Sequence, residues 1–408
     1  MEKWFKKKEI IDSGALLFLA LVPRLAYYFT RLLSEKGLPQ AHDTEWYLRH
    51  ARLLLSNFHV DIDFNGIFYL SYYSLLALML VFVKTQAGIV FIQMLINAVS
   101  VVLVYKISIL LFNRRTGILA GVFYALLWPV IYWSIYIITD SLFISLMLLQ
   151  VYFLLKAYDT GKKSYWGLFA GTSLYMIFFR PTGVVTLTFV FVYIIINLKT
   201  KGYVNKYKPY IICAGVVAAI AVVYLAGVVS ASSLGRSLYY NMRWLLLHNY
   251  AEGRIYDIVT PYDYKYRAVT GPRFSDNFVI SFFINNWNHI LVLYGKRIVS
   301  FAGVWVWKLD SVGMLVRLKY ILPTAAALFV AGVGIAGMVR RKIFRKASIL
   351  IFVVLSILFF TVFFFMDSAY RYRVPALVFL TIIGAYGVDI CIDIGLKGLK
   401  RLKGMGVK

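Results

Sequence analysis

The 408-residue sequence is poor in cysteine, in acidic side chains and in known catalytic motifs. Its two cysteines, Cys213 and Cys391, each lie inside an apolar run, which argues against a disulfide framework or a metal site built on cysteine. The five histidines are scattered without the spacing of metal ligands. There is no P-loop, no G-x-G-x-x-G after a strand, no H-E-x-x-H and no G-x-S-x-G elbow. These absences argue against ATP or a nucleotide sugar as substrate.

Apolar residues are abundant instead. The chain is 61% hydrophobic and 15% charged, whereas a soluble domain is about 45–50% apolar. Lipid-exposed backbone must satisfy its own hydrogen bonds, so the apolar runs are predicted to be transmembrane helices. The net charge of +26 arises from 44 Lys and Arg against 18 Asp and Glu. The basic residues fall mostly in short loops between apolar runs, which indicates membrane topology and predicts no nucleic-acid partner.

The sequence predicts an all-α polytopic membrane protein of about 10–11 helices, with interfacial helices in the first long external loop. The predicted spans lie near 12–32, 87–111, 117–135, 141–157, 165–180, 183–198, 209–230, 321–339, 347–366 and 374–395. The run 67–83 is predicted to be re-entrant or interfacial, because a crossing there would place several basic loops outside the cell.

Residues 1–408 are therefore predicted to form a single transmembrane domain with two long external segments, 33–86 and 231–320. The basic loops all fall on the cytoplasmic side in this arrangement. The expected location is the plasma (inner) membrane, with the functional residues on the extracytoplasmic side.

A short polar run, Ala41–Tyr47, follows the first span and contains two carboxylates, Asp43 and Glu45. Carboxylates beside a bilayer are costly and often functional. Asp43 and Tyr47 share a helix face at four-residue spacing, whereas Glu45 points elsewhere. A second carboxylate, Asp140, precedes another span on the same predicted side. For Asp43, and likewise for Asp140, the alternative is that the residue is only a helix N-cap.

Three arginines lie on the predicted extracytoplasmic side of the membrane, where the topology rule expects few basic residues: Arg180, Arg371 and Arg373. A local anion explains that position, since guanidinium groups bind phosphate through paired hydrogen bonds. Arg24, within the first span, is a further candidate of this kind. The alternative is that these arginines are ion-paired or extend to the interface without binding a ligand.

The ordered motifs resemble the GT-C glycosyltransferases, in particular the branch related to protein O-mannosyltransferases and lipid A aminoarabinose transferase. The resemblance rests on Asp43 with Tyr47 and Ala51, Gln93–Leu95, Leu111–Arg115, Trp128–Pro129, Thr139–Asp140, Phe179–Pro181 and Tyr370–Pro375. It implies a transmembrane enzyme that transfers a sugar, with inversion, from a polyprenyl-phosphate donor on the extracytoplasmic face. Thr44 separates Asp43 from Glu45, whereas the family often has adjacent Asp and Glu, which weakens the case for Glu45.

The resemblance also implies roles for individual residues. Asp43 is the expected general base, with Asp140 and Glu45 as further catalytic carboxylates. The expected residues that bind substrate or donor phosphate are Arg371, Arg373, Arg180, Tyr372, Arg24, Tyr47 and His42. The sequence identifies no definite cofactor, and a divalent cation, Mg²⁺ or Mn²⁺, held by the carboxylates stays an open alternative.

The expected partners are the lipid bilayer, a polyprenyl-phosphate sugar and an acceptor that is a glycan, a lipid or a protein. Two competing functions stay open. A lipid-linked-sugar transporter or flippase and a non-catalytic assembly factor that binds the lipid carrier both need the arginines.

Overall fold

A computed structural model of the chain is helical throughout the part that it describes, with no strand among those residues. The described residues are 2–61, 63–200, 233–255, 267–271, 276–303, 314–364 and 369–405. The predicted span 209–230 lies outside them.

The first half of the chain forms α1 (Glu2–Leu32), α2 (Thr44–Asn57), α3 (Phe64–Phe68), α4 (Leu70–Phe82), α5 (Gln86–Leu111), α6 (Arg114–Ala125), α7 (Trp128–Trp133), α8 (Thr139–Thr160), α9 (Lys163–Ile177) and α10 (Pro181–Thr200). The second half forms α12 (Ser233–Leu245), the π-helical turn η1 (Leu246–Tyr250), α13 (Phe278–Asn285), α14 (Trp287–Phe301), α15 (Met314–Arg340), α16 (Phe344–Phe363), α17 (Ala369–Tyr372) and α18 (Val374–Met405).

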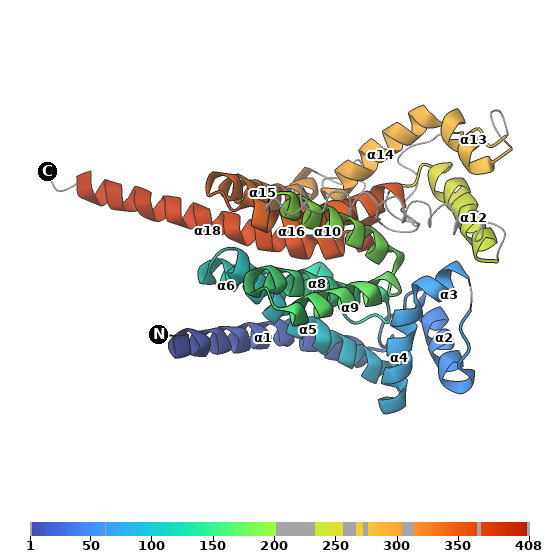
Figure 1. Ribbon diagram of the computed structural model, residues 1–408, viewed down its shortest axis with the longest axis horizontal. Helices are drawn as coiled ribbons and strands as arrows, with labels where there is room; N and C mark the ends of the chain where they lie inside the picture. The colour runs from blue at the N-terminus through green and yellow to red at the C-terminus, as the bar shows by residue number, and fades with distance from the viewer. Residues whose placement is uncertain are drawn as a thin grey trace.

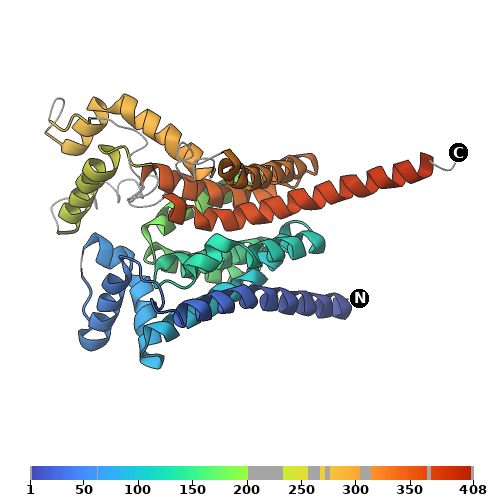
Figure 2. The ribbon, with the colours of Figure 1, turned by 180° about the vertical axis from the view of Figure 1, so that it is seen from behind.

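The long helices run side by side as a bundle, which confirms the predicted all-α membrane architecture (Figure 1). Six helices in the described part of the chain are long and apolar enough to cross a membrane. They are Lys7–Leu32, Gln86–Leu111, Thr139–Thr160, Ile321–Arg340, Phe344–Phe363 and Val374–Gly398. The chain is thus a multi-pass membrane protein. Both termini lie at one end of the bundle, and α2, α3, α12 and α13 gather at the other (Figure 2).

The predicted span 117–135 is not one continuous helix. α6 ends at Ala125, and the short helix α7 begins only at Trp128. Pro129 lies in the first turn of α7, and its ring nitrogen has no hydrogen to donate to the carbonyl four residues earlier, so the helix cannot continue from α6 without a break. This break allows Ile137–Asp140 to enter the site at the start of α8.

The apolar run predicted to be re-entrant or interfacial forms α4, which lies across the long axis of the bundle rather than along it (Figure 1). Its first turn is fixed to the end of α9. The Ser71 amide donates to the Phe178 carbonyl at 2.8 Å, and the Tyr175 hydroxyl donates to the Ser71 carbonyl at 2.8 Å. α4 thereby supports α2, which carries Asp43 at its start.

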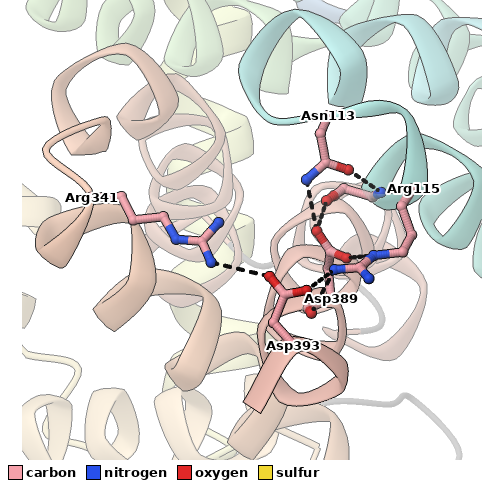
Figure 3. Close-up of polar contacts among 6 residues, drawn as sticks. Asn113, Arg115, Arg341, Asp389 and Asp393 are labelled. Atoms are coloured by element: carbon pink, nitrogen blue, oxygen red, sulfur yellow. Dashed lines mark hydrogen bonds and ion pairs between the residues drawn. The ribbon is translucent and has the colours of Figure 1, made fainter. Parts of the chain in front are cut away.

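The end of the bundle that contains the termini is held by a buried carboxylate, Asp389 of α18 (Figure 3). Asp389 accepts hydrogen bonds from Asn113 Nδ2 at 2.7 Å and Thr116 Oγ1 at 2.9 Å, and pairs with Arg115. One turn later, Asp393 pairs with the same Arg115 and with Arg341, 3.4 Å away. Two basic loops that are far apart in sequence are thereby joined to α18 at the same end.

Glycines allow α15 and α18 to pack with their backbones close together. A Cβ at Gly387 would overlap the carbonyl oxygen of Val330, and one at Gly334 would overlap that of Ile383. Small residues at such positions are the usual basis of close helix packing in membranes. These contacts hold α15 against the middle of α18, the helix that follows directly after α17 and the site arginines.

Gly387→Ala should destabilise the protein by about 1–3 kcal/mol, because the added methyl group forces the two helices apart. Gly395→Ala in the same helix is the matched control, since a Cβ there meets no other atom within 4 Å. Thermal unfolding of both variants in detergent measures the difference. An equal melting temperature for the two variants would contradict the close packing.

Candidate functional site

Asp43 stands immediately before α2, yet its side chain does not cap that helix. The carboxylate is 39% exposed, and its Oδ2 lies 3.4 Å from Nη2 of Arg371. The helix-cap alternative therefore does not explain this residue. The local turn is held instead by Thr44, whose hydroxyl accepts from the Ala41 amide and donates to the Ile137 carbonyl.

Asp140 lies in the first turn of α8 and is fully buried. The N-cap position of α8 is occupied by Ile138, so Asp140 lies inside the helix and is not its N-cap. Its Oδ1 accepts a hydrogen bond from Nη1 of Arg180 at 2.6 Å, and its Oδ2 lies 3.5 Å from Nε of Arg371. The partial positive charge at a helix N-terminus also favours a carboxylate here.

Arg371 joins the two carboxylates, since its Nη2 faces Asp43 and its Nε faces Asp140. Burial lowers the pKa of Arg371, but Asp140, Tyr372 and Asp43 together raise it well above its usual value, so the group stays charged. The Tyr372 ring lies against both arginines, 4.5 Å from Arg180 and 5.1 Å from Arg371. Residues from three distant parts of the sequence thus form one cluster.

The two arginines differ in how firmly they are held. Arg180 is buried and has a short, direct hydrogen bond to Asp140. Both contacts of Arg371 with carboxylates are 3.4 Å or longer. Long ion pairs are weaker than charge-assisted hydrogen bonds of about 2.7–2.9 Å. An incoming anion can therefore compete for Arg371 more easily than for Arg180.

A cavity of about 480 Å³ opens beside Asp43. One wall comes from the segment between α1 and α4, with His42, Trp46, Tyr47, Asn65 and Tyr69. The opposite wall comes from α12, with Tyr240, Asn241 and Trp244, and Tyr372 completes the lining. Burial raises the pKa of Tyr47 well above its usual value, so its hydroxyl stays protonated.

A histidine that is hydrogen-bonded to a carboxylate supports the wall formed by α2. His50 lies against the Trp46 indole, with ring centroids 3.8 Å apart, and contacts Asp61 Oδ2 at 2.8 Å. Hydrogen bonds from His59 and His50 lower the pKa of Asp61, so that carboxylate stays charged. These contacts fix the orientation of Trp46 at the cavity.

The structure brings together six of the predicted site residues, at the cavity or the ion-paired cluster. They are Asp43, Asp140, Arg180, Arg371, Tyr372 and Tyr47. His42, which is exposed, lines the cavity as well.

Three other predicted residues lie apart from the carboxylates. Glu45 is 64% exposed and its nearest cation is Arg52, 4.0 Å away. Arg373 turns toward α14, where its Nη1 is 3.3 Å from the carbonyl oxygens of Ser300 and Phe301. Arg24 is buried between α1, α5 and α6, with hydrogen bonds to Asn97 and to the Ala20 and Ala125 carbonyls. Each of these side chains is turned toward partners outside the cluster.

The alternative of a divalent cation between the carboxylates does not fit the groups present. Arg371 already occupies the position between Asp43 and Asp140, and its positive charge opposes a metal ion there. Across the described ranges, no three His, Cys, Asp or Glu side chains converge in a way that could hold a metal.

The sequence reasoning did not single out Trp46, Asn65, Tyr69, Tyr240, Asn241 or Trp244. One signal was available for α12, because Tyr240 and Trp244 are four residues apart and so share a helix face. No such signal existed for the pairing of α12 with α3, which joins segments about 170 residues apart through the Phe64 amide and the Ser237 hydroxyl.

Comparison with known proteins supports the sequence resemblance. Residues 69–226 match the family model described as dolichyl-phosphate-mannose-protein mannosyltransferase. The archaeal oligosaccharyltransferase AglB from Archaeoglobus fulgidus, solved with an inhibitory peptide and a dolichol-phosphate, superposes with a TM-score of 0.56 at 13% identity. The chain has the GT-C fold.

The superposition covers 98% of this chain and 52% of AglB, so the chain spans about half the length of that protein. The same oligosaccharyltransferase in its apo form gives a TM-score of 0.53 at 13% identity, with the same two coverages. No curated protein matches the sequence. The resemblance to GT-C glycosyltransferases is confirmed, and the relatives found are glycosyltransferases of that class.

Arg180→Gln should lower the free energy of unfolding by about 3–5 kcal/mol, because it leaves the buried Asp140 carboxylate without its closest partner. The loss should shrink when Asp140→Asn is already present, since the two changes remove the same interaction. Thermal unfolding of the two single variants and the double variant measures this coupling. Arg49→Gln, at an exposed position in α2, is the control. If the loss of stability in the double variant equals the sum of the losses in the two single variants, the direct pairing of Arg180 with Asp140 is contradicted.

Proposed function

We propose that the protein is an inverting glycosyltransferase that moves a sugar from a polyprenyl-phosphate donor to an acceptor hydroxyl. The observation that carries this proposal is the arrangement around Asp43: a half-exposed carboxylate beside a cavity, 3.4 Å from a buried arginine. The family description names a dolichyl-phosphate sugar, and AglB was solved with a dolichol-phosphate, which supports a lipid-linked donor.

Asp43 is the general base in this mechanism. Asp140 is fully buried and paired with Arg180, so it has no access to an acceptor, whereas Asp43 is exposed to the cavity. Asp43 takes the proton of the acceptor hydroxyl as the hydroxyl oxygen attacks the anomeric carbon from the face opposite the phosphate. The bond from the anomeric carbon to the phosphate oxygen breaks, and polyprenyl phosphate leaves with the electron pair.

Arg371 stabilises the negative charge that develops on the departing phosphate. Its long contacts with both carboxylates allow it to turn toward an anion, and its raised pKa keeps it positively charged. Arg180 serves as a positioning residue that holds Asp140, and Asp140 in turn holds Arg371 in place. Tyr372 separates the two guanidinium groups.

The reaction is assigned to the extracytoplasmic face of the plasma membrane. The charge asymmetry of the loops supports this side. Arg115 and Arg341, from two basic loops, pair with α18 at the end of the bundle that contains the termini, and basic loops are typical of the cytoplasmic side. Asp43 and the cavity lie at the opposite end, beside α3 and α12.

Asp43→Asn should reduce transfer by about 10²–10⁴-fold while leaving the melting temperature nearly unchanged, because the amide keeps the shape but cannot accept the proton. Transfer from a purified polyprenyl-phosphate sugar by the full chain in liposomes is the measurement. Glu45→Gln is the matched control and should retain activity, since Glu45 lies outside the cavity lining. Near-normal turnover by Asp43→Asn would remove the general base from this mechanism and favour a transporter or a binding protein.

Arg371→Ala should lower kcat by about 10²–10³-fold, with a smaller change in KM, because the lost charge stabilises the departing phosphate more than the bound donor. Arg373→Ala is the comparison, because its side chain contacts the end of α14. Its main effect should be on stability. A larger loss of kcat in Arg373→Ala would assign the phosphate to Arg373 instead.

A further inference from the structure

The cavity beside Asp43 lies between two external segments that are far apart in sequence. α12 and α3 meet there, and the Phe64 amide lies 3.4 Å from the Ser237 hydroxyl (Figure 2). Its volume of about 480 Å³ falls within the range of about 300–1,000 Å³ that is usual for small-molecule sites. The cavity is therefore large enough for a ligand beyond the group that reacts at Asp43.

The lining of this cavity combines aromatic rings with neutral amides. Tyr240 is 69% exposed although it is a large aromatic residue, and Trp244 lies one turn along the same helix. Asn241 and Asn65 contribute amide groups from opposite walls. The Asn241 amide is oriented by a hydrogen bond from its Nδ2 to the Ser237 carbonyl at 2.8 Å.

Formal charge is scarce in the same lining. Among the described residues that line the cavity, Asp43 is the sole Asp, Glu, Lys or Arg. A ligand with several charges would find no matching groups there and would lose hydration without compensation. A ligand with apolar faces and hydroxyl edges finds both kinds of partner, because aromatic rings offer flat apolar surface and amides offer hydrogen bonds.

We infer that this cavity is the acceptor subsite and that the acceptor is an uncharged carbohydrate. A sugar ring packs its C–H face on Tyr240 and Trp244, while Asn65 and Asn241 bind its hydroxyl groups. One free hydroxyl then reaches Asp43, which completes the step described above. The inference rests on the proposed function for the identity of that step, but binding of the carbohydrate does not require the donor.

The experiment measures binding to the full chain in nanodiscs without any donor. The probes are methyl hexosides, maltose, cellobiose and lactose, with glucuronic acid and N-acetylneuraminic acid as charged counterparts and a serine-containing peptide as a competing acceptor. Saturation-transfer NMR reports contact with the sugar. The expected result is saturable binding of at least one uncharged sugar, with weaker binding of the charged sugars and the peptide.

Tyr240→Ala should weaken that binding by about threefold to tenfold, because the exposed ring supplies a stacking surface. Tyr239→Ala is the matched control: this neighbouring tyrosine is also exposed, but it does not line the cavity. Equal losses in the two variants would overturn the inference. Preferential binding of the peptide, or no binding by any uncharged sugar, would overturn it as well.

Transfer assays separate this inference from the proposed function. Sugar binding that depends on Tyr240, without transfer from a polyprenyl-phosphate sugar, would support the acceptor cavity and contradict the proposed reaction. Transfer to a peptide or a lipid that is lost in Asp43→Asn but unchanged in Tyr240→Ala would support the reaction and overturn the carbohydrate acceptor.

Discussion

The site depends on the charge balance around Arg371. This guanidinium lies between Asp43 and Asp140, and Arg180 holds Asp140 from the other side, so two cations and two carboxylates offset one another. Burying any one of these groups alone would be costly at the end of an apolar bundle. Together they form a cluster in which only Asp43 is substantially exposed. The exposure of Asp43 and the long contacts of Arg371 are what make a reaction with an anionic leaving group chemically reasonable.

The remaining architecture positions these four side chains. The break between α6 and α7 brings Asp140 to the start of α8, and Pro181 at the start of α10 follows directly after Arg180. Close packing of α15 against α18 through glycine holds the middle of α18, the helix that follows Arg371 and Tyr372. At the far end of the bundle, Asp389 joins α18 to α6 through Arg115 and Asn113. α18 is therefore held by contacts with two other helices.

Much of this could be predicted from residue type and order. Apolar runs and basic loops identified a helical membrane protein, and the predicted span 374–395 begins where α18 begins, at Val374. Asp43, Asp140, Arg180 and Arg371 were recognisable because charged groups at such positions are costly without a partner or a ligand. Glu45 was separable from Asp43 by helical spacing, and the structure places the two side chains apart. The extent of α6 was predicted wrongly, because the effect of Pro129 on the preceding backbone was not weighed against the continuous apolar run.

Arginine roles could not be read from the sequence in the same way. The four arginines look alike in the sequence, as isolated cations near apolar segments, yet they have different partners. Arg24 binds an amide and backbone carbonyls, and Arg180 binds a buried carboxylate. Arg371 lies between two carboxylates, and Arg373 contacts the end of α14. The sequence by itself determined the membrane class, the helical architecture and the set of costly charged residues, because these follow from local composition and spacing. Only the tertiary structure decided which charges meet, that Asp43 rather than Asp140 is exposed, and that α12 closes a cavity over it. Those outcomes depend on contacts between segments 40 or more residues apart, which local patterns do not encode.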